Sequence, residues 1–194
     1  MTIVPSLPQH AQLIGKAVTA AIGHELASEL AGSDHTVEDV ESLFAALAAR
    51  DDTQYSYVNS LTALDDDGNV MGIVVSYDGA GLIEMRRIFF AEAKTRIGLT
   101  FETPDGNPDS LPGETDPEEY YLDSLAVFEP YRGKGVARAL ITAARDRARR
   151  AGKPLGLLVD KNNARARSLY DSIGFIPMGE REFAGELMDH MVLE

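Results

Sequence analysis

The sequence predicts an α/β fold with a mixed, twisted sheet flanked by helices. Two strand-like segments joined by a tight turn in the N-terminal half indicate antiparallel pairing. Strands and helices alternate in the C-terminal half, which indicates parallel pairing through right-handed crossovers. The chain has 194 residues, 44% hydrophobic and 25% charged, as in ordinary globular proteins. We therefore expect a single domain over 1–194, with an N-terminal half of about 1–119 and a C-terminal half of about 120–194.

The first 50 residues are expected to form a short strand and two helices. Residues 2–5 are β-like, and residues 7–30 place apolar side chains at helical spacing. Asp34 or Thr36 can cap a second helix, which keeps the three-to-four period and ends near Arg50.

A β-hairpin is expected next. Residues 55–64 and 70–77 form its strands, and the Asp-Asp-Asp-Gly-Asn cluster at 65–69 forms its turn. A second turn follows at 78–81. Residues 82 to about 97 are expected to be a strand end followed by a helix, because apolar residues there recur at helical spacing.

A long loop separates the two halves of the chain. Residues 103–119 contain four prolines, two glycines and many acids, so they favour no regular structure. Beyond this loop, we expect strands at 120–127 and 154–159, helices at 135–151 and 164–173, and a final strand or two from residue 175 onward.

The charge of the chain is strongly uneven. With 18 basic and 31 acidic residues the net charge is −13, yet residues 131–167 hold eleven Lys or Arg against two acids. This window has a charge of +9 and the rest −22. Such a basic region can attract a polyanionic ligand while the rest repels polyanions, so we expect no nucleic-acid partner. Alternatively, these cations only keep helix surfaces soluble.

Several classes of protein fit the composition poorly. Cysteine is absent, which excludes disulfides and cysteine nucleophiles, and the four histidines lack metal-site spacing, so we expect no metal. No apolar run reaches the roughly 18 to 20 residues of a membrane helix, and the N-terminus lacks the pattern of a signal peptide. We therefore expect a cytoplasmic protein without a membrane partner, as a monomer or homodimer.

The most informative segment is a glycine-rich turn between a strand and a helix. The strand ends at Val127, and Gly133 and Gly135 precede the helix. Glycines allow a tight turn, and the first N–H groups of a helix lack intrahelical partners, so this arrangement can bind an anion such as a pyrophosphate. An ordinary tight turn is the alternative. A dinucleotide fingerprint would need Gly or Ala where Arg138 stands, and a P-loop would need a Lys-Ser or Lys-Thr pair after Gly135.

Two blocks of sequence resemble the GNAT superfamily of N-acetyltransferases. The first is Arg-x-x-Gly-x-Ala, read from Arg132, Gly135 and Ala137; the second is Asn-x-x-Ala-x-x-Leu-Tyr-x-x-x-Gly-Phe, read from Asn163 to Phe175. The resemblance implies a GNAT-like fold and acetyl-CoA as the acyl donor. It also implies that the following residues bind acetyl-CoA: Leu125, Ala126, Val127, Arg132, Gly133, Lys134, Gly135, Val136, Ala137, Arg138, Asn163, Ala166 and Tyr170.

The resemblance also suggests how the acyl group is transferred. Tyr170 would protonate the leaving thiolate, and a backbone N–H near Ala126 or Val127 would stabilise the oxyanion. Tyr170 as a packing tyrosine is the alternative. Asp123 interrupts the apolar strand 120–127 and is our first choice for the general base, although it can equally be a solvated aspartate.

The expected function is transfer of an acetyl group to a primary amine of a small molecule. The alternatives are a protein lysine or N-terminal acetyltransferase, and a noncatalytic CoA-binding module. Three further carboxylates are reserve candidates for the base: Glu84, Glu114 and Asp116. The acidic loop 103–119 can attract a cationic amine or only add solubility, and three tyrosines of the hairpin can line the acceptor pocket or simply pack: Tyr55, Tyr57 and Tyr77.

Overall fold

The computed structural model describes residues 1–100, 103, 105 and 107–194. Positions 104 and 106 of the expected loop lie outside the described residues. The strands are β1 (Thr2–Pro5), β2 (Ser60–Leu64), β3 (Val70–Asp78), β4 (Tyr120–Val127), β5 (Leu155–Val159), β6 (Ile176–Phe183) and β7 (Glu186–Leu193). The helices are α1 (Ala11–Ala31), α2 (Val37–Ala48), α3 (Leu82–Ile97), α4 (Val136–Arg150) and α5 (Ala164–Ile173).

The seven strands form one mixed sheet in the order β1-β2-β3-β4-β5-β7-β6. β4 and β5 run parallel, and the other neighbouring pairs are antiparallel. The mixed sheet predicted from the sequence is therefore confirmed. The crossover from β4 to β5 runs through α4, as a parallel connection requires.

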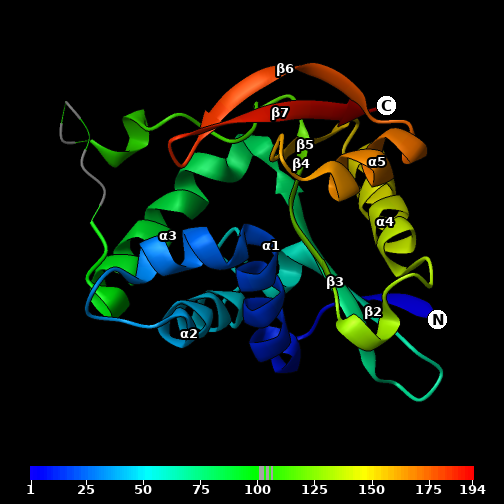
Figure 1. The fold of residues 1–194 in the computed structure, drawn as a ribbon, viewed down its shortest axis with the longest axis horizontal. Helices are drawn as coiled ribbons and strands as arrows, with labels where there is room; N and C mark the ends of the chain where they lie inside the picture. The colour runs from blue at the N-terminus through cyan, green and yellow to red at the C-terminus, as the bar shows by residue number, and fades with distance from the viewer. Residues whose placement is uncertain (101–102, 104, 106) are drawn as a thin grey trace.

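Helices cover both faces of the sheet (Figure 1). α1, α2 and α3 lie on one face, where Ile73, Val75 and Tyr77 of β3 share a core with Phe44. α4 and α5 lie on the other face, where Val74 contributes from the same strand. Because side chains alternate along a strand, β3 supplies both cores and stands at the centre of the molecule.

The first helix differs from the sequence prediction in two ways. It begins at Ala11 rather than near residue 7, because Pro8–His10 form a 3₁₀ turn. It is also interrupted at Gly23, whose φ of 83° and ψ of 165° are not helical. A residue with a side chain adopts this backbone only with strain, so glycine permits the break.

Two other segments were predicted wrongly. The strand expected at 55–64 begins only at Ser60, because Ser56 accepts the N–H of Val58 and caps a 3₁₀ turn. The segment from Leu82 is helical throughout, with no strand end. Asp78 accepts the N–H of Ala80 and thereby starts the 3₁₀ turn that leads into α3.

The long acidic loop is anchored to α3. The Arg86 guanidinium donates to the carbonyl oxygens of Leu111 and Pro112 at 2.8 and 2.9 Å. Glu114 and Thr115 are buried in consequence. The described part of the loop therefore brings acidic side chains into the interior as well as to the surface.

Candidate active site

β4 and β5 separate soon after they begin to pair. Their parallel register covers only Tyr120 with Leu155 and Tyr121 with Gly156. Beyond this point, β4 continues its antiparallel pairing with β3 as far as Val127. The edge of β4 that faces away from β3 is therefore open from Asp123 onward, and it forms one wall of a cleft.

The end of β4 presents backbone groups to this cleft. Phe128 donates its N–H to Met71 at 2.9 Å, on the β3 side. Because N–H groups alternate sides along a strand, the N–H of Val127 points to the open side and that of Ala126 to β3. The Val127 carbonyl is also on the open side, where it accepts the Nε–H of Arg132 at 3.2 Å. Of the two N–H groups considered from the sequence, only that of Val127 can meet a ligand.

The turn after β4 presents backbone groups that can bind an anion. Gly133 and Gly135 have φ values of 76° and 78°, and a Cβ at either position would meet nothing within 4 Å. Their glycine identity thus follows from backbone conformation, and the space above them is open. Within the described part of the chain, the N–H groups of residues 133–138 have no acceptor. Together with the N-terminus of α4 they favour a phosphate group.

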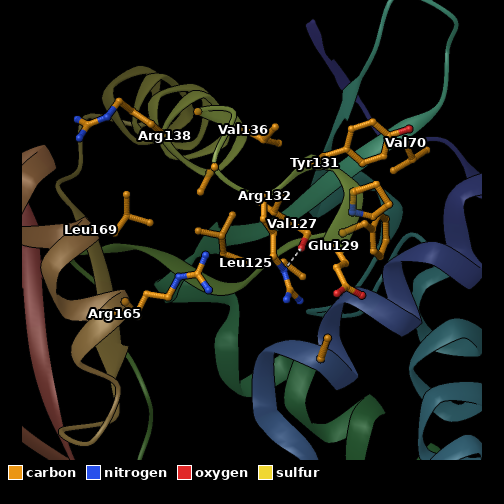
Figure 2. A pocket seen from close by; sticks show the side chains of 18 of the residues that line it. Val70, Leu125, Val127, Glu129, Tyr131, Arg132, Val136, Arg138, Arg165 and Leu169 are labelled. Carbon is orange, nitrogen blue, oxygen red and sulfur yellow. Dashed lines mark hydrogen bonds between the residues drawn. The ribbon is translucent and has the colours of Figure 1, made fainter.

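A cavity of about 1170 Å³ lies between this turn, α1 and α5. Its charged lining is mostly cationic, and we call it the basic cavity. Figure 2 shows the side chains of Arg132 and Arg165 pointing toward the same space from two different elements. Arg138 reaches instead to Ser172, to whose hydroxyl it donates at 2.8 Å. The charged residues of the lining are Lys16, Arg132, Arg138, Arg165 and Glu129.

A second cavity of about 1290 Å³ adjoins the first and has the opposite charge. Neither Lys nor Arg is among the described residues that line it, and we call it the acidic cavity. Residues 20–26 on either side of the break in α1 form one wall, and the turn between β6 and β7 forms another. Its carboxylates are Glu25, Glu29, Glu114, Asp123, Asp160 and Glu186.

The two cavities meet at five residues that line both. They are Ala20, Leu125, Asn163, Ala166 and Tyr170. Asn163 caps α5 by accepting the N–H of Ala166 at 3.0 Å, which fixes the helix against the junction. Molecules that occupy the two cavities would therefore approach each other beside Tyr170.

Tyr170 presents an unused hydroxyl at this junction. The residue is 8% exposed and its ring packs edge-on against Phe175 at 5.4 Å. Its hydroxyl has no hydrogen-bond partner among the described residues. Burial raises the pKa of Tyr170 to about 12, so the hydroxyl keeps its proton at neutral pH. It can therefore donate that proton to a ligand.

Asp123 occupies a β-bulge in β4. The register with β3 passes from Val75–Ser124 to Ser76–Leu122, which leaves Asp123 as the extra residue. A bulge redirects its side chain, here into the acidic cavity. Its carboxylate accepts hydrogen bonds from Tyr77 at 2.9 Å and Ser124 at 2.7 Å. Burial, reinforced by the nearby Glu114 carboxylate, raises the pKa of Asp123 to about 7, so it can accept a proton at neutral pH.

The remaining candidates divide into those at the cavities and those away from them. Lys134 does not line the basic cavity; its ammonium lies 5.4 Å from the ring centre of Tyr131. Glu84 is exposed and pairs with Arg87 at 3.0 Å, and Asp116 pairs with Arg181. Of the three reserve carboxylates, only Glu114 lines the acidic cavity.

The hairpin tyrosines have different positions. Tyr55 lines the acidic cavity, whereas Tyr57 does not. Tyr77 is 1% exposed and contacts the site only through its hydroxyl.

Sequence reasoning missed the contribution of α1. Leu13, Lys16 and Ala20 line the basic cavity, although they lie more than 100 residues before the glycine turn. Helical periodicity alone gives no indication that this face meets a ligand. Arg165 was also missed, although it stands inside the block from Asn163 to Phe175.

The geometry fits a nucleotide-linked acyl donor. Free amides and guanidinium groups can hold phosphates, and the open edge of β4 can pair with an extended amide-containing arm. Among the residues that the structure describes, no group of three or more His, Asp or Glu is arranged to hold a metal ion. In the same part of the chain, no helix has the length and apolar character needed to cross a membrane. The fold and the site together therefore fit an acyltransferase.

Comparison with known proteins identifies the family. Residues 21–175 match the model of the acetyltransferase (GNAT) family, so the chain belongs to this family. The uncharacterized N-acetyltransferase YycN of Bacillus subtilis (strain 168) is 39% identical over 59 residues, which are 30% of this chain and 38% of that protein. The resemblance inferred from the two sequence blocks is confirmed.

Solved structures share the whole fold. An acetyltransferase crystal structure is 28% identical, with a TM-score of 0.77 over 100% of this chain and 99% of the other. The fold is also shared by yncA from Salmonella typhimurium, whose structure holds its cofactor acetyl-CoA; it is 17% identical, with a TM-score of 0.54 over 100% of this chain and 91% of that one.

Proposed function

We propose that this protein transfers the acetyl group of acetyl-CoA directly to a primary amine of a small molecule. The observation that carries the proposal is the meeting of a basic and an acidic cavity beside Tyr170. A polyanionic donor suits the first cavity and a cationic acceptor suits the second. A noncatalytic CoA-binding module would not need the second cavity or its carboxylates.

The CoA end of the donor would lie in the basic cavity. The pyrophosphate would accept hydrogen bonds from the free N–H groups of residues 133–138, with Arg132 and Arg165 nearby. The pantetheine arm would lie along the open edge of β4 between Leu125 and Val127. Acetyl-CoA, when bound, supplies a thioester carbonyl that an amine can attack.

Three groups of the protein would assist the transfer. Asp123 would accept a proton from the amine nitrogen as the new C–N bond forms, because its pKa of about 7 suits a base at neutral pH. The Val127 N–H would stabilise negative charge on the carbonyl oxygen. Tyr170 would give its proton to the thiolate sulfur as the C–S bond breaks, and no covalent intermediate with the enzyme is needed.

The lining of the acidic cavity supports a cationic acceptor. Elements from three parts of the chain surround it: α1, the end of β5 and the β6–β7 turn. Its carboxylates lie both beside Asp123 and toward the exposed residues Glu25 and Glu29, so a cationic amine is attracted along its length. A lysine or N-terminal amine of a protein shares the same charge and is the second candidate.

Thiol release from acetyl-CoA, followed across a panel of small primary amines and basic peptides, tests this function. We expect release with small amines and much slower release with peptides. Faster release with peptides would assign a protein acceptor instead. No release with any amine, despite a melting-temperature increase with acetyl-CoA, would identify a noncatalytic binding module.

A further inference from the structure

Three buried polar side chains lead from α3 to the half-buried Asp123. The Arg86 Nη1 atom lies 3.6 Å from Glu114 Oε2, and Glu114 Oε1 lies 3.2 Å from the Tyr77 hydroxyl. The same hydroxyl lies 2.9 Å from Asp123 Oδ2. Arg86, Glu114 and Tyr77 are 6%, 4% and 1% exposed, so solvent does little to screen these contacts. Glu114 is therefore coupled to Asp123 although it does not touch it.

The Tyr77 hydroxyl lies between two carboxyl groups but has a single proton to donate. The Tyr77 hydroxyl has one proton and lies within hydrogen-bond distance of two carboxyl groups. It can donate to only one of them at a time. When Asp123 is ionised, the shorter contact favours donation to Asp123; when Asp123 carries a proton, the hydroxyl is free to rotate toward Glu114. Each carboxylate thus affects the hydrogen bond available to the other.

Arg86 favours the ionised form of Glu114. Its guanidinium also donates to two backbone carbonyls of the acidic loop, which hold it in place beside the carboxyl. Burial raises the pKa of Glu114, and Arg86 opposes this shift. When Glu114 is ionised, its charge makes a second negative charge on Asp123 more costly. Three tyrosines near Asp123 have pKa values raised by burial and stay neutral: Tyr55, Tyr77 and Tyr121. The acidic cavity also holds other titratable groups, including His24, Glu25, Glu29, Asp160 and Glu186.

We propose that Glu114 is a positioning residue that makes Asp123 a stronger base, and that Tyr77 is the switch between them: its hydroxyl donates to Asp123 when Asp123 is ionised and to Glu114 when Asp123 is protonated. This proposal deepens the proposed function, on which it rests. It assigns a role to the acidic loop: the loop places one carboxylate in the interior of the protein, where the carboxylate acts on the site through a neighbouring strand.

The two partners should shift the Asp123 titration in opposite directions. Glu114→Gln removes the neighbouring negative charge, so the pKa of Asp123 should fall by roughly one unit. Tyr77→Phe removes a hydrogen bond to the ionised carboxylate, so the pKa should rise by a similar amount. If either residue had a purely structural role, the two variants would not shift the pKa of Asp123 in opposite directions. The double variant should differ from the sum of the two shifts, because the groups act on each other.

The experiment measures the Asp123 carboxyl titration by carbon-detected NMR on the ligand-free protein, together with the acidic limb of kcat/KM against pH. Glu84→Gln and Asp116→Asn are controls, since both acids form exposed pairs away from the cavity. Shifts of opposite sign in both readouts support the proposal. An unchanged pKa of Asp123 in Glu114→Gln overturns the proposal. A lower pKa of Asp123 in Tyr77→Phe also overturns it. If the Glu114 variant does not fold, the Tyr77 variant alone decides the outcome. Absence of acetyl transfer by the unmodified protein would refute the proposed function and leave the NMR shifts interpretable.

Discussion

The Nε atom of Arg132 donates a hydrogen bond to the carbonyl oxygen of Val127 over 3.2 Å. This contact joins the glycine-rich turn to the last residue of β4, so two parts of the proposed donor site are held together by one side chain (Figure 2). Arg132 also adds positive charge to the basic cavity.

Arg132→Ala should weaken acetyl-CoA binding about tenfold, which corresponds to about 1.4 kcal/mol. The affinity falls because the variant lacks the cation and also lacks the hydrogen bond to the Val127 carbonyl. Titration calorimetry measures it directly. Arg149→Ala is the matched control, because Arg149 is exposed near the other end of α4. Equal affinities in the two variants would contradict a role for Arg132.

The two ends of α4 offer a matched pair of glycines. Gly135 and Gly152 have φ values of 78° and 70°, and a Cβ at either would meet nothing within 4 Å. A glutamate at either position should cost a similar stability, about 1–2 kcal/mol, because both must adopt a left-handed backbone. Only Gly135→Glu places a negative charge at the proposed pyrophosphate site. We expect acetyl-CoA to raise the melting temperature of Gly152→Glu but not of Gly135→Glu.

Tyr170→Phe should separate chemistry from binding. The variant keeps the ring that packs on Phe175 and removes the hydroxyl proposed to protonate the thiolate. We expect kcat to fall about 10²-fold with acetyl-CoA affinity nearly unchanged. Tyr57→Phe, outside both cavities, serves as the control. If kcat of Tyr170→Phe equals that of the unmodified protein, Tyr170 is only a packing residue.

Asp123→Asn should abolish acetyl transfer and raise the stability of the protein at high pH. Asp123 has a pKa of about 7 in the folded protein against an ordinary pKa of 3.8, so the folded state binds a proton more tightly than the unfolded state. Stability from this residue is therefore lost as pH rises from about 4 to above 7. Denaturant unfolding should find Asp123→Asn more stable than the unmodified protein at pH 8.5, with the gap narrowing toward pH 4, while acetyl transfer is lost. A gap that widens on acidification would contradict the raised pKa.

The C-terminal half of the fold was predictable because its information is local. The turn at Gly133 and Gly135 and the Asn163 block each combine a backbone requirement with a helix start, and both stand in the structure where the sequence indicated. The start of the strand expected at 55–64 was not predictable, because the side chain of Ser56 caps a 3₁₀ turn and the strand begins only at Ser60. Nor could the sequence reveal that Glu114 reaches Tyr77, a contact across 37 positions that depends on how Arg86 anchors the loop.

The candidate site was predictable only in part for the same reason. Asp123 was conspicuous as a carboxylate within an apolar strand, and the bulge explains how it leaves the sheet plane. Lys16 and Ala20 gave no comparable indication, because their spacing is that of any helix packed on a sheet. The lining of the acidic cavity combines α1 with the β6–β7 turn. No single segment of the sequence shows that these distant residues lie together.

The break in α1 at Gly23 divides the charged residues that this helix contributes to the two cavities. Residues before it, such as Lys16, line the basic cavity, whereas Glu25 and Glu29 after it line the acidic cavity. Because the break separates the two segments, substitutions after it can change the charge of the acidic cavity while Lys16 and the basic cavity keep theirs.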